Sequence, residues 1–350
     1  MTIQSLLQTT IDRKASDLHL IAGYAPTIRV NGVLSPLDSA VLTGEQIEGL
    51  LNPLLTKEQK TLFEANHELD FGYSFGVGRF RVNAYFQKGT TAVAFRLIPL
   101  KILGIEELNL PKICHDLTSL HQGLILVTGP TGHGKSTTIA AMIDEINKNF
   151  GGHILTIEDP VDYVYSPEKA LISQREVGAD THSWMGALRG ALREDPNIVL
   201  VGEMRDYETI AAALTIAETG HLVFATLHTN SASQSIDRIV DVFPENQQAQ
   251  IRLQLSNCLE AIISQRLLPG ITEGRVPAVE ILLASPAVRS TIREGKTHMI
   301  DNIIQTSGDL GMRTMDMSLS ALLASGKISY ETAMAYASNP ENIGRGIKKK

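Results

Sequence analysis

The sequence predicts an α/β fold divided into two modules, a smaller one over residues 1–98 and a larger one over residues 117–350, with a linker at residues 99–116. Three observations support this prediction. From about residue 117 onward, strand, loop and helix patterns alternate, which is typical of a mostly parallel sheet packed against helices. A glycine-rich loop separates the first of these strands from the first helix. In the smaller module, strand patterns with period two end at Pro99.

Composition places the chain among soluble globular proteins, because its 350 residues are 43% hydrophobic and 20% charged and suffice for two domains with cores of their own. No apolar run reaches the length of a membrane span, and the N-terminus has no signal pattern. We therefore expect a cytoplasmic protein without stable membrane insertion. The net charge of −7 disfavours a nucleic-acid partner. Cys114 and Cys258 form no C-x-x-C pair, so we expect core thiols rather than a disulfide framework or a zinc site.

The smaller module contains both helix and strand patterns. We expect a helix at residues 5–13, a hairpin at residues 27–34 with a tight turn at Asn31-Gly32, two helices within residues 44–65 on either side of Pro53, and strands at residues 79–86 and 92–98.

Three arginines lie on these last two strands. Arg79 and Arg81 share the polar face of the first strand, and Arg96 lies in the second. An exposed strand face that simply carries charge is one interpretation, and spacing alone favours it. The alternative is that these arginines reach into a phosphoryl-transfer site on another part of an assembly.

The larger module alternates strands with helices up to residue 244. We expect strands at residues 123–128, 153–157, 198–201 and 221–227, and helices at residues 136–149, 183–193 and 207–219. After residue 244 the pattern is nearly all helix, which predicts a helical C-terminal region.

The loop after the first of these strands fits G-x-x-x-x-G-K-[ST], the phosphate-binding loop of nucleotide triphosphatases. Its glycines let successive backbone N–H groups face one anion, and the following helix adds its positive N-terminal end. Lys135 can reach the terminal phosphates, Ser136 can bind the accompanying Mg²⁺, and Thr137 can cap the helix or contact the α-phosphate. The strand before the loop and the helix after it argue against a chance glycine-rich turn. The predicted nucleotide-binding residues are Gly129, Pro130, Thr131, Gly132, His133, Gly134, Lys135, Ser136 and Thr137.

Acidic residues and a histidine end the other predicted strands, at Glu158, Glu203 and His228. Because ligands of open parallel sheets lie beyond the carboxyl ends of the strands, we expect these side chains to converge on the phosphate loop. One carboxylate there can orient the attacking water and another can hold magnesium. Glu203 ends an apolar run as a Walker-B acid would, with Gly202 in place of the common Asp. Alternatively, each of the two acids caps a helix or forms a salt bridge at the surface, and His221 and His228 have structural roles.

These residues together resemble a known family. Over almost its whole length the chain is similar to the secretion ATPases of type II/IV systems, and within them to the motors that retract type IV pili. Several motifs in a fixed order carry the resemblance, which makes it more specific than a phosphate loop alone. They lie at residues 15–20, 129–137, 156–160, 191–196, 202–206, 219–222 and 226–229.

The resemblance implies a PAS-like N-terminal domain and a RecA-like P-loop ATPase domain that assemble into a homo-hexameric ring. ATP with Mg²⁺ would be held by the ATPase domain and closed over by the N-terminal domain of a neighbouring subunit. Arg79, Arg81 and Arg96 match arginines that face the nucleotide in the family, which reverses the interpretation from spacing. The other residues implied for catalysis and binding are Lys135, Glu158 of the Asp box as general base, Glu203 as Walker-B acid, and His221 and His228 of the His box, with Ser136 and Glu203 as metal ligands.

The resemblance also bears on the kind of motor. Assembly ATPases of the family usually carry a four-cysteine zinc element and a longer N-terminal region, and neither is present. Residues 285–294 resemble the A-I-R-N-L-I-R-E helix of retraction motors, with a basic face at Arg289 and Arg293. Ser290-Thr291 stands where that helix has Asn-Leu, so a PilU-like accessory motor stays an alternative.

As a retraction motor, the protein would hydrolyse ATP to ADP and phosphate, pull on an inner-membrane pilus platform protein (PilC-like) and depolymerise the pilus. We expect it at the inner face of the cytoplasmic membrane, at the pilus base, with a second retraction ATPase as a further candidate partner. Two other classes of function stay open. The acidic balance argues against a RecA-like nucleic-acid translocase, and the strand-end carboxylates argue against a nucleotide-gated ring subunit without turnover.

Overall fold

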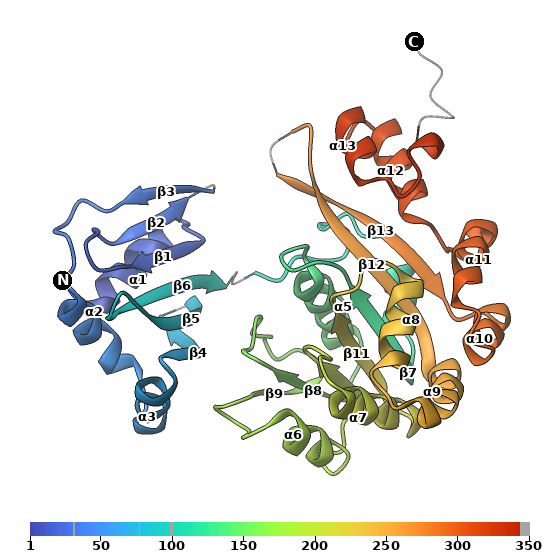
Figure 1. The fold of residues 1–350 in the computed structure, drawn as a ribbon, viewed down its shortest axis with the longest axis horizontal. Coiled ribbons are helices and arrows are strands. Elements are labelled where there is room, and N and C mark those ends of the chain that lie inside the picture. Colours follow the sequence, from blue (N-terminus) through green and yellow to red (C-terminus); the bar gives the residue numbers. More distant parts are fainter. Residues whose placement is uncertain (31, 77, 99–100, 273, 344–350) are drawn as a thin grey trace. The chain divides into compact units, whose positions relative to one another are not determined.

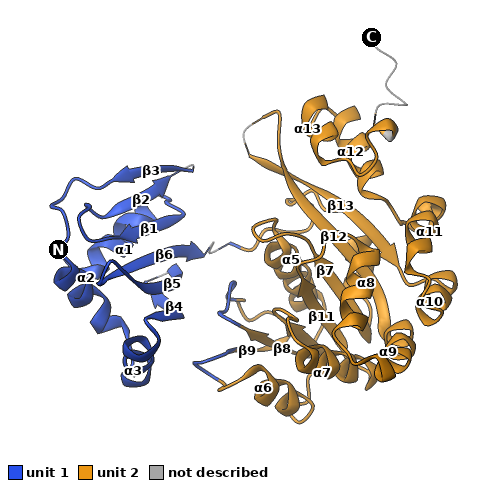
Figure 2. Ribbon diagram, in the orientation of Figure 1, with its two compact units in different colours: residues 1–101, 159–164, 176–180 blue, residues 102–158, 165–175, 181–350 orange. Residues whose placement is uncertain are grey.

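The computed structural model describes residues 1–30, 32–76, 78–98, 101–272 and 274–343. It consists of two compact units (Figure 2): unit 1 comprises residues 1–101, 159–164 and 176–180, and unit 2 comprises residues 102–158, 165–175 and 181–350. The boundary after residue 101 lies close to the predicted end of the smaller module at residue 98. The sequence did not indicate that the two short segments between residues 159 and 180 belong to unit 1. The turn residue Asn31 and the first linker residues, 99–100, lie outside the described residues.

Unit 1 is built on an antiparallel sheet whose described part has six strands in the order β3-β2-β1-β6-β5-β4 (Figure 1). Its elements are α1 (Ile3–Asp12), β1 (Asp17–Leu20), β2 (Thr27–Val30), β3 (Val33–Pro36), α2 (Gly44–Leu51), η1 (Asn52–Leu54), α3 (Lys57–Asn66), β4 (Glu68–Phe75), β5 (Gly78–Gln87) and β6 (Thr90–Ile98). Capping boxes at Thr43 and Thr56 start α2 and α3. The three helices share one core with the sheet, where Phe80 and Phe95 pack edge to face.

Unit 2 is built on a sheet with seven strands in its described part, in the order β13-β12-β7-β11-β10-β8-β9. β7 runs parallel to β11 and β12, and β10 runs parallel to β8 and β11, which confirms the predicted mostly parallel sheet. β7 and β11 are buried along their whole length, which explains why both appear as unbroken apolar runs. The elements up to residue 258 are α4 (Ile113–Thr118), β7 (Gly123–Thr128), α5 (Lys135–Asn149), β8 (His153–Glu158), β9 (Leu171–Glu176), α6 (Trp184–Ala191), β10 (Ile198–Val201), α7 (Tyr207–Glu218), β11 (Leu222–Leu227), α8 (Ala232–Asp241) and α9 (Glu245–Cys258).

The prediction of an almost wholly helical region after residue 244 is wrong. β12 (Leu259–Pro269) and β13 (Arg275–Leu283) form a long antiparallel hairpin, and β12 joins the central sheet beside β7. An apolar run that is buried on both faces has no period that separates a strand from a helix, so the pattern was ambiguous. Helices follow the hairpin: α10 (Pro286–Arg293), η2 (Thr297–Met299), α11 (Ile300–Thr306), η3 (Gly308–Leu310), α12 (Met315–Ala324), α13 (Tyr330–Tyr336) and η4 (Pro340–Asn342). In the part of the chain that the structure describes, no helix has both the length and the apolar composition of a membrane span.

Candidate active site

The phosphate loop connects β7 to α5. Gly129, Gly132 and Gly134 adopt φ angles of 140°, 79° and 84°, a region that glycine enters without steric cost. Lys135, the first residue of α5, is only 8% exposed, and its Nζ donates to the carbonyl oxygens of Gly129 (2.8 Å) and Pro130 (3.0 Å). Burial lowers the pKa of the Lys135 ammonium group below its ordinary value, against the opposing effect of the Glu203 carboxylate. The lysine therefore lies across the loop, next to the positive end of α5.

Four neighbouring strands end at this edge of the unit 2 sheet. Thr128 at the end of β7 is paired with Leu227 of β11, and Val201 of β10 is paired with Ala225 of β11 and Ile157 of β8. The residues at the ends of these strands, or just after them, therefore lie at one edge. They are the phosphate loop, His228, Glu203 and Glu158, as the strand-end argument predicted.

Glu203 lies between two basic side chains. Arg205 forms a two-point contact with it, with Nε 2.7 Å from Oε1 and Nη2 2.7 Å from Oε2. His228 Nε2 lies 3.0 Å from Glu203 Oε1. Burial raises the pKa of the Glu203 carboxyl, but the hydrogen bond and charge of Arg205, together with His228 and Lys135, outweigh burial and bring the pKa below its ordinary value. Glu203 is therefore ionised at neutral pH.

His228 connects this acidic residue to the phosphate loop. Its Nδ1 lies 3.4 Å from Lys135 Nζ and 3.3 Å from Thr131 Oγ1, while its Nε2 contacts Glu203. One imidazole thus touches the lysine, the loop and the carboxylate.

Glu158 ends β8 and is only 7% exposed. Beside it, Gly202 donates its N–H to the carbonyl oxygen of Ile157 (2.9 Å). A Cβ atom at Gly202 would lie 3.2 Å from that oxygen and 3.3 Å from Glu158 Cα. This close approach accounts for glycine at the position where a Walker-B aspartate is common. It also brings Glu203, the next residue, to the same edge as Glu158.

His221 does not lie with these side chains. Within one chain, the structure therefore differs from the expectation that His221 belongs to the nucleotide site. It precedes β11, at the end where Leu222 pairs with Gly123, whereas the phosphate loop follows the other end of β7. The two ends are about 17 Å apart at the usual rise per residue. His221 Nδ1 instead lies 3.1 Å from the Ile216 carbonyl oxygen and 3.1 Å from Thr219 Oγ1, where it caps the end of α7.

The three candidate arginines belong to unit 1. Arg81 of β5 stands directly opposite Arg96 of β6 in the strand register, so two guanidinium groups share one face. Asp17 accepts a hydrogen bond from Arg96 Nε at 3.0 Å, while the Arg96 side chain stays 68% exposed. Arg79 pairs with the buried Glu176, which is also part of unit 1.

The donor set at the edge of the sheet fits magnesium. Ser136 offers a hydroxyl oxygen on an exposed residue at the start of α5, and Glu203 offers an ionised carboxylate. Mg²⁺ in nucleotide sites usually keeps one or two such protein ligands and takes its remaining oxygens from phosphates and water. Within the described ranges no group of three or more His, Cys, Asp or Glu side chains could form an all-protein metal site.

Two residues that the sequence did not single out hold the loop from its outer side. Gln265 Nε2 donates to the carbonyl oxygen of His133 (2.9 Å), and Arg275 Nη1 donates to that of Gly132 (3.1 Å). Both lie in the β12–β13 hairpin, which the sequence pattern did not separate from a helix. The available signal was the polar pair Gln265-Arg266 inside an apolar run.

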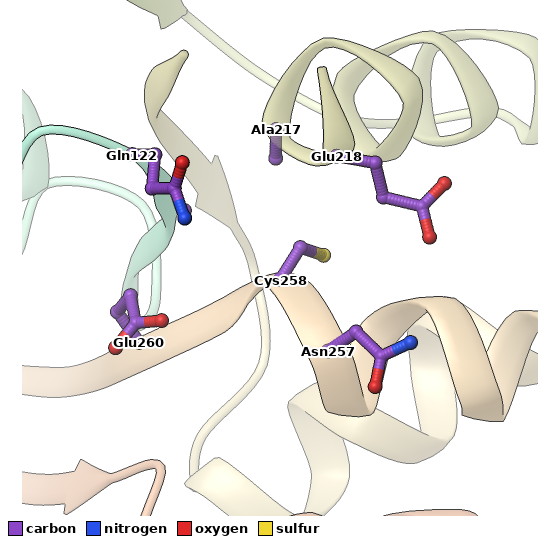
Figure 3. A pocket seen from close by; sticks show the side chains of 7 residues that line it. Gln122, Ala217, Glu218, Asn257, Cys258 and Glu260 are labelled. Carbon is purple, nitrogen blue, oxygen red and sulfur yellow. The ribbon is translucent and has the colours of Figure 1, made fainter. Parts of the chain in front are cut away.

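A pocket of about 350 Å³ lies at the opposite edge of the sheet, beside the start of β7 (Figure 3). It is lined by Gln122, Gly123, Ala217, Glu218, Asn257, Cys258 and Glu260. Because the charged side chains that line it are carboxylates, this pocket does not suit a phosphate.

The two cysteines are both buried free thiols. Burial raises the pKa of the Cys258 thiol to about 12 and that of the Cys114 thiol to about 12. This confirms the expectation of core thiols.

The expected basic face of α10 is only half correct. Arg293 is exposed, but Arg289 turns inward. Its Nη1 donates to the carbonyl oxygens of Ser256 and Asn257, both at 2.8 Å, and its Nη2 lies 2.8 Å from Glu260. Arg289 therefore satisfies carbonyl groups at the end of α9 and fastens α10 to it.

Comparison with known proteins agrees with this geometry. Residues 88–275 match the family model of type II/IV secretion system proteins. The chain is 50% identical to the type IV pilus retraction ATPase PilT of Pseudomonas aeruginosa over 98% of this chain and 100% of that relative, and 39% identical to the type IV pilus ATPase PilU of the same bacterium over 99% of this chain and 92% of that relative. A crystal structure of the pilus retraction motor PilT with bound ADP matches with a TM-score of 0.91 and 46% identity over 99% of both chains. The chain therefore belongs to the type II/IV secretion system protein family.

Proposed function

We propose that this protein is a hexameric motor that hydrolyses ATP to ADP and phosphate and thereby powers the retraction of a type IV pilus. One observation carries the proposal: a phosphate loop, two acidic residues and a histidine lie at the ends of neighbouring parallel strands, at one edge of the unit 2 sheet. The higher identity to PilT than to PilU supports retraction by a principal motor over an accessory one.

In the proposed reaction, Lys135 and the backbone N–H groups of the loop bind the phosphates of ATP. The lysine Nζ exchanges its loop carbonyl contacts for phosphate oxygens. Ser136 and Glu203 hold Mg²⁺, which supplies positive charge to the phosphates when bound. Glu158 accepts the proton of the attacking water, a role that contributes about 10²–10⁴ in rate when a carboxylate is well placed. His228 senses the terminal phosphate, because it contacts both the loop lysine and Glu203.

Arg79, Arg81 and Arg96 from unit 1 of a neighbouring subunit complete the charge around the triphosphate. The register of Arg81 and Arg96 supports this part of the proposal. Like charges directly opposite each other in a sheet are unfavourable, and a bound phosphate would add to the compensation that Asp17 already gives Arg96. The nucleotide thereby becomes part of the contact between subunits, and its hydrolysis changes how strongly they hold each other. The motor would act on a platform protein at the inner face of the cytoplasmic membrane, beside a second retraction ATPase where one is present.

Steady-state phosphate release by the purified protein tests the site. Lys135→Ala should reduce turnover to background, whereas Lys148→Ala, at an exposed lysine near the other end of the same helix, should not. Substantial turnover in Lys135→Ala would contradict the assignment of the site.

Deletion of the gene tests the direction of the motor. Cells with surplus surface fibres and no surface motility indicate retraction. Cells without fibres would instead indicate assembly and would overturn the retraction part of the proposal.

A further inference from the structure

The β12–β13 hairpin holds both the phosphate loop and the first turn of α5. Gln265 is central to this contact, since it is only 3% exposed and uses both ends of its side-chain amide. Its Nε2 donates to the carbonyl oxygen of His133 (2.9 Å), and its Oε1 accepts from the Thr138 hydroxyl of α5 (2.7 Å). Arg275 adds a hydrogen bond to the carbonyl oxygen of Gly132 (3.1 Å).

His133 adds a contact through its ring. The backbone N–H of Leu267 in β12 donates to His133 Nδ1 at 3.0 Å. A ring nitrogen accepts a hydrogen bond only in the neutral imidazole, with the proton on the other nitrogen, because both nitrogens of the imidazolium ion are donors. This contact therefore exists only while His133 is neutral.

These contacts orient the groups that a phosphate would need. In a trans peptide the carbonyl oxygen and the following N–H point in opposite directions. Because the carbonyl groups of Gly132 and His133 are turned toward the hairpin, the N–H groups of His133 and Gly134 are turned away from it. The His133 N–H lies on the inner side of the loop, where it meets the Pro130 carbonyl oxygen at 3.4 Å. The fit is close, since a Cβ atom at Gly134 would lie 2.8 Å from Gln265 Nε2. A loop that lost this support would have to reorder its N–H groups at each binding event.

We propose that Gln265 and His133 are positioning residues of the nucleotide site, and that the need for a neutral His133 makes nucleotide binding sensitive to acid. This inference rests on the proposed function, because it concerns the same phosphate loop. It adds a strand outside the loop to the site and gives the motor a response to pH.

The surroundings of His133 set the direction of this response. Burial lowers the pKa of His133 below the ordinary 6.5, and the positive charges of Arg266 of β12, Lys135 of α5 and Arg275 of β13 lower it further. The ring is therefore neutral at neutral pH, and the Leu267 contact is present. As the pH falls through this lowered pKa, the ring gains a proton, the contact is lost and binding weakens.

The test is the dissociation constant of a fluorescent ADP analogue, measured with the full-length protein across an acid-to-neutral pH series. His133→Ala should raise this constant about fivefold at neutral pH, the size expected for one hydrogen bond. His133→Asn should lose less affinity than His133→Ala at neutral pH, because the amide oxygen can accept in place of Nδ1 and does not titrate. Under acid conditions the wild type should lose about fivefold in affinity and His133→Asn should not. Gln265→Met, which keeps the length but not the polar atoms, should weaken binding at every pH.

Matched controls separate the possible outcomes. His298→Asn changes an exposed histidine of η2 and should follow the wild type at every pH. The inference is overturned if His133→Asn loses affinity in acid as the wild type does, or if His133→Ala binds as the wild type does. If the thermal midpoint of Gln265→Met without nucleotide is lowered, this variant is destabilised and its weaker binding does not count. The His133 variants then decide, because the His133 side chain is half exposed and its replacement disturbs the core less. Unchanged binding in Lys135→Ala would instead contradict the proposed function itself.

Discussion

Replacing Gly129 by alanine should damage the phosphate loop through one contact. Gly129 has a φ of +140°, and a Cβ atom built there would lie 2.3 Å from the backbone carbonyl oxygen of Gln265. Ordinary van der Waals contact for such an atom begins at 3.4 Å. Either the loop or β12 must therefore shift by about 1 Å, and β12 is held between β7 and β13.

The cost follows from what a shift of this size breaks. The hydrogen bonds of Gln265 to His133 (2.9 Å) and to Thr138 (2.7 Å) would stretch beyond hydrogen-bond length. Each contributes about 1 kcal/mol, and the left-handed backbone adds about 1 kcal/mol for a residue with a Cβ atom. The total of about 3 kcal/mol corresponds to a loss of about a hundredfold in nucleotide affinity.

Gly132→Ala is the matched control in the same loop. Gly132 also has a positive φ, of +79°, but among the described residues no atom outside its two chain neighbours lies within 4 Å of the position that a Cβ atom would take there. Only the backbone cost of about 1 kcal/mol applies, which corresponds to about fivefold in affinity. Titration of each variant with ADP gives both values. Equal losses in the two variants would refute the role of the Gln265 contact, and wild-type affinity in Gly129→Ala would refute the packing argument altogether.

Two further predictions concern catalysis and pH. Glu158→Gln should reduce phosphate release by about 10²–10⁴ while ADP affinity stays within about threefold, and an unchanged rate would exclude Glu158 as general base. His115 lies 3.0 Å from Glu145 and 2.7 Å from Glu106, and the hydrogen bond that His115 donates to the Glu145 carboxylate is the main cause that raises the pKa of His115 above the ordinary 6.5. A raised pKa in the folded state contributes stability below pH 6.5 that is lost as the pH rises through the raised value. The urea midpoint of the wild type should therefore fall over this range more than that of His115→Gln, and parallel curves would count against the pairing.

Several features of the site follow from short stretches of sequence. The phosphate loop is recognised from eight consecutive positions, Gly129 to Ser136, because phosphate binding needs glycines and a lysine at fixed spacing. Glu158, Glu203 and His228 could be placed beside it because each directly follows an apolar run, and parallel strands end at the same edge of a sheet. The alternation in β5 likewise predicted its buried side, with Phe80 fully covered.

Other features depend on contacts between distant residues. Leu259–Pro269 is a strand only because β7 and β13 flank it, and an apolar run buried on both faces carries no periodicity of its own. Gln265 could not be recognised as a support for the phosphate loop until that strand was in place. Arg289 was expected to form a basic face with Arg293, but it donates instead to carbonyl groups at the end of α9.

Local spacing alone led to the predictions of which residues bind phosphate, which acids lie at the strand ends, and in what order they occur along the chain. Local spacing suffices for these features, because each depends on neighbours within a few residues. Only the tertiary structure showed which residues hold the phosphate loop in place and which predicted site residues lie far from it. His133 and Gln265 meet across 132 positions of the chain, and His221 is kept at the far end of β11, because the order and register of strands are set by packing over the whole sheet.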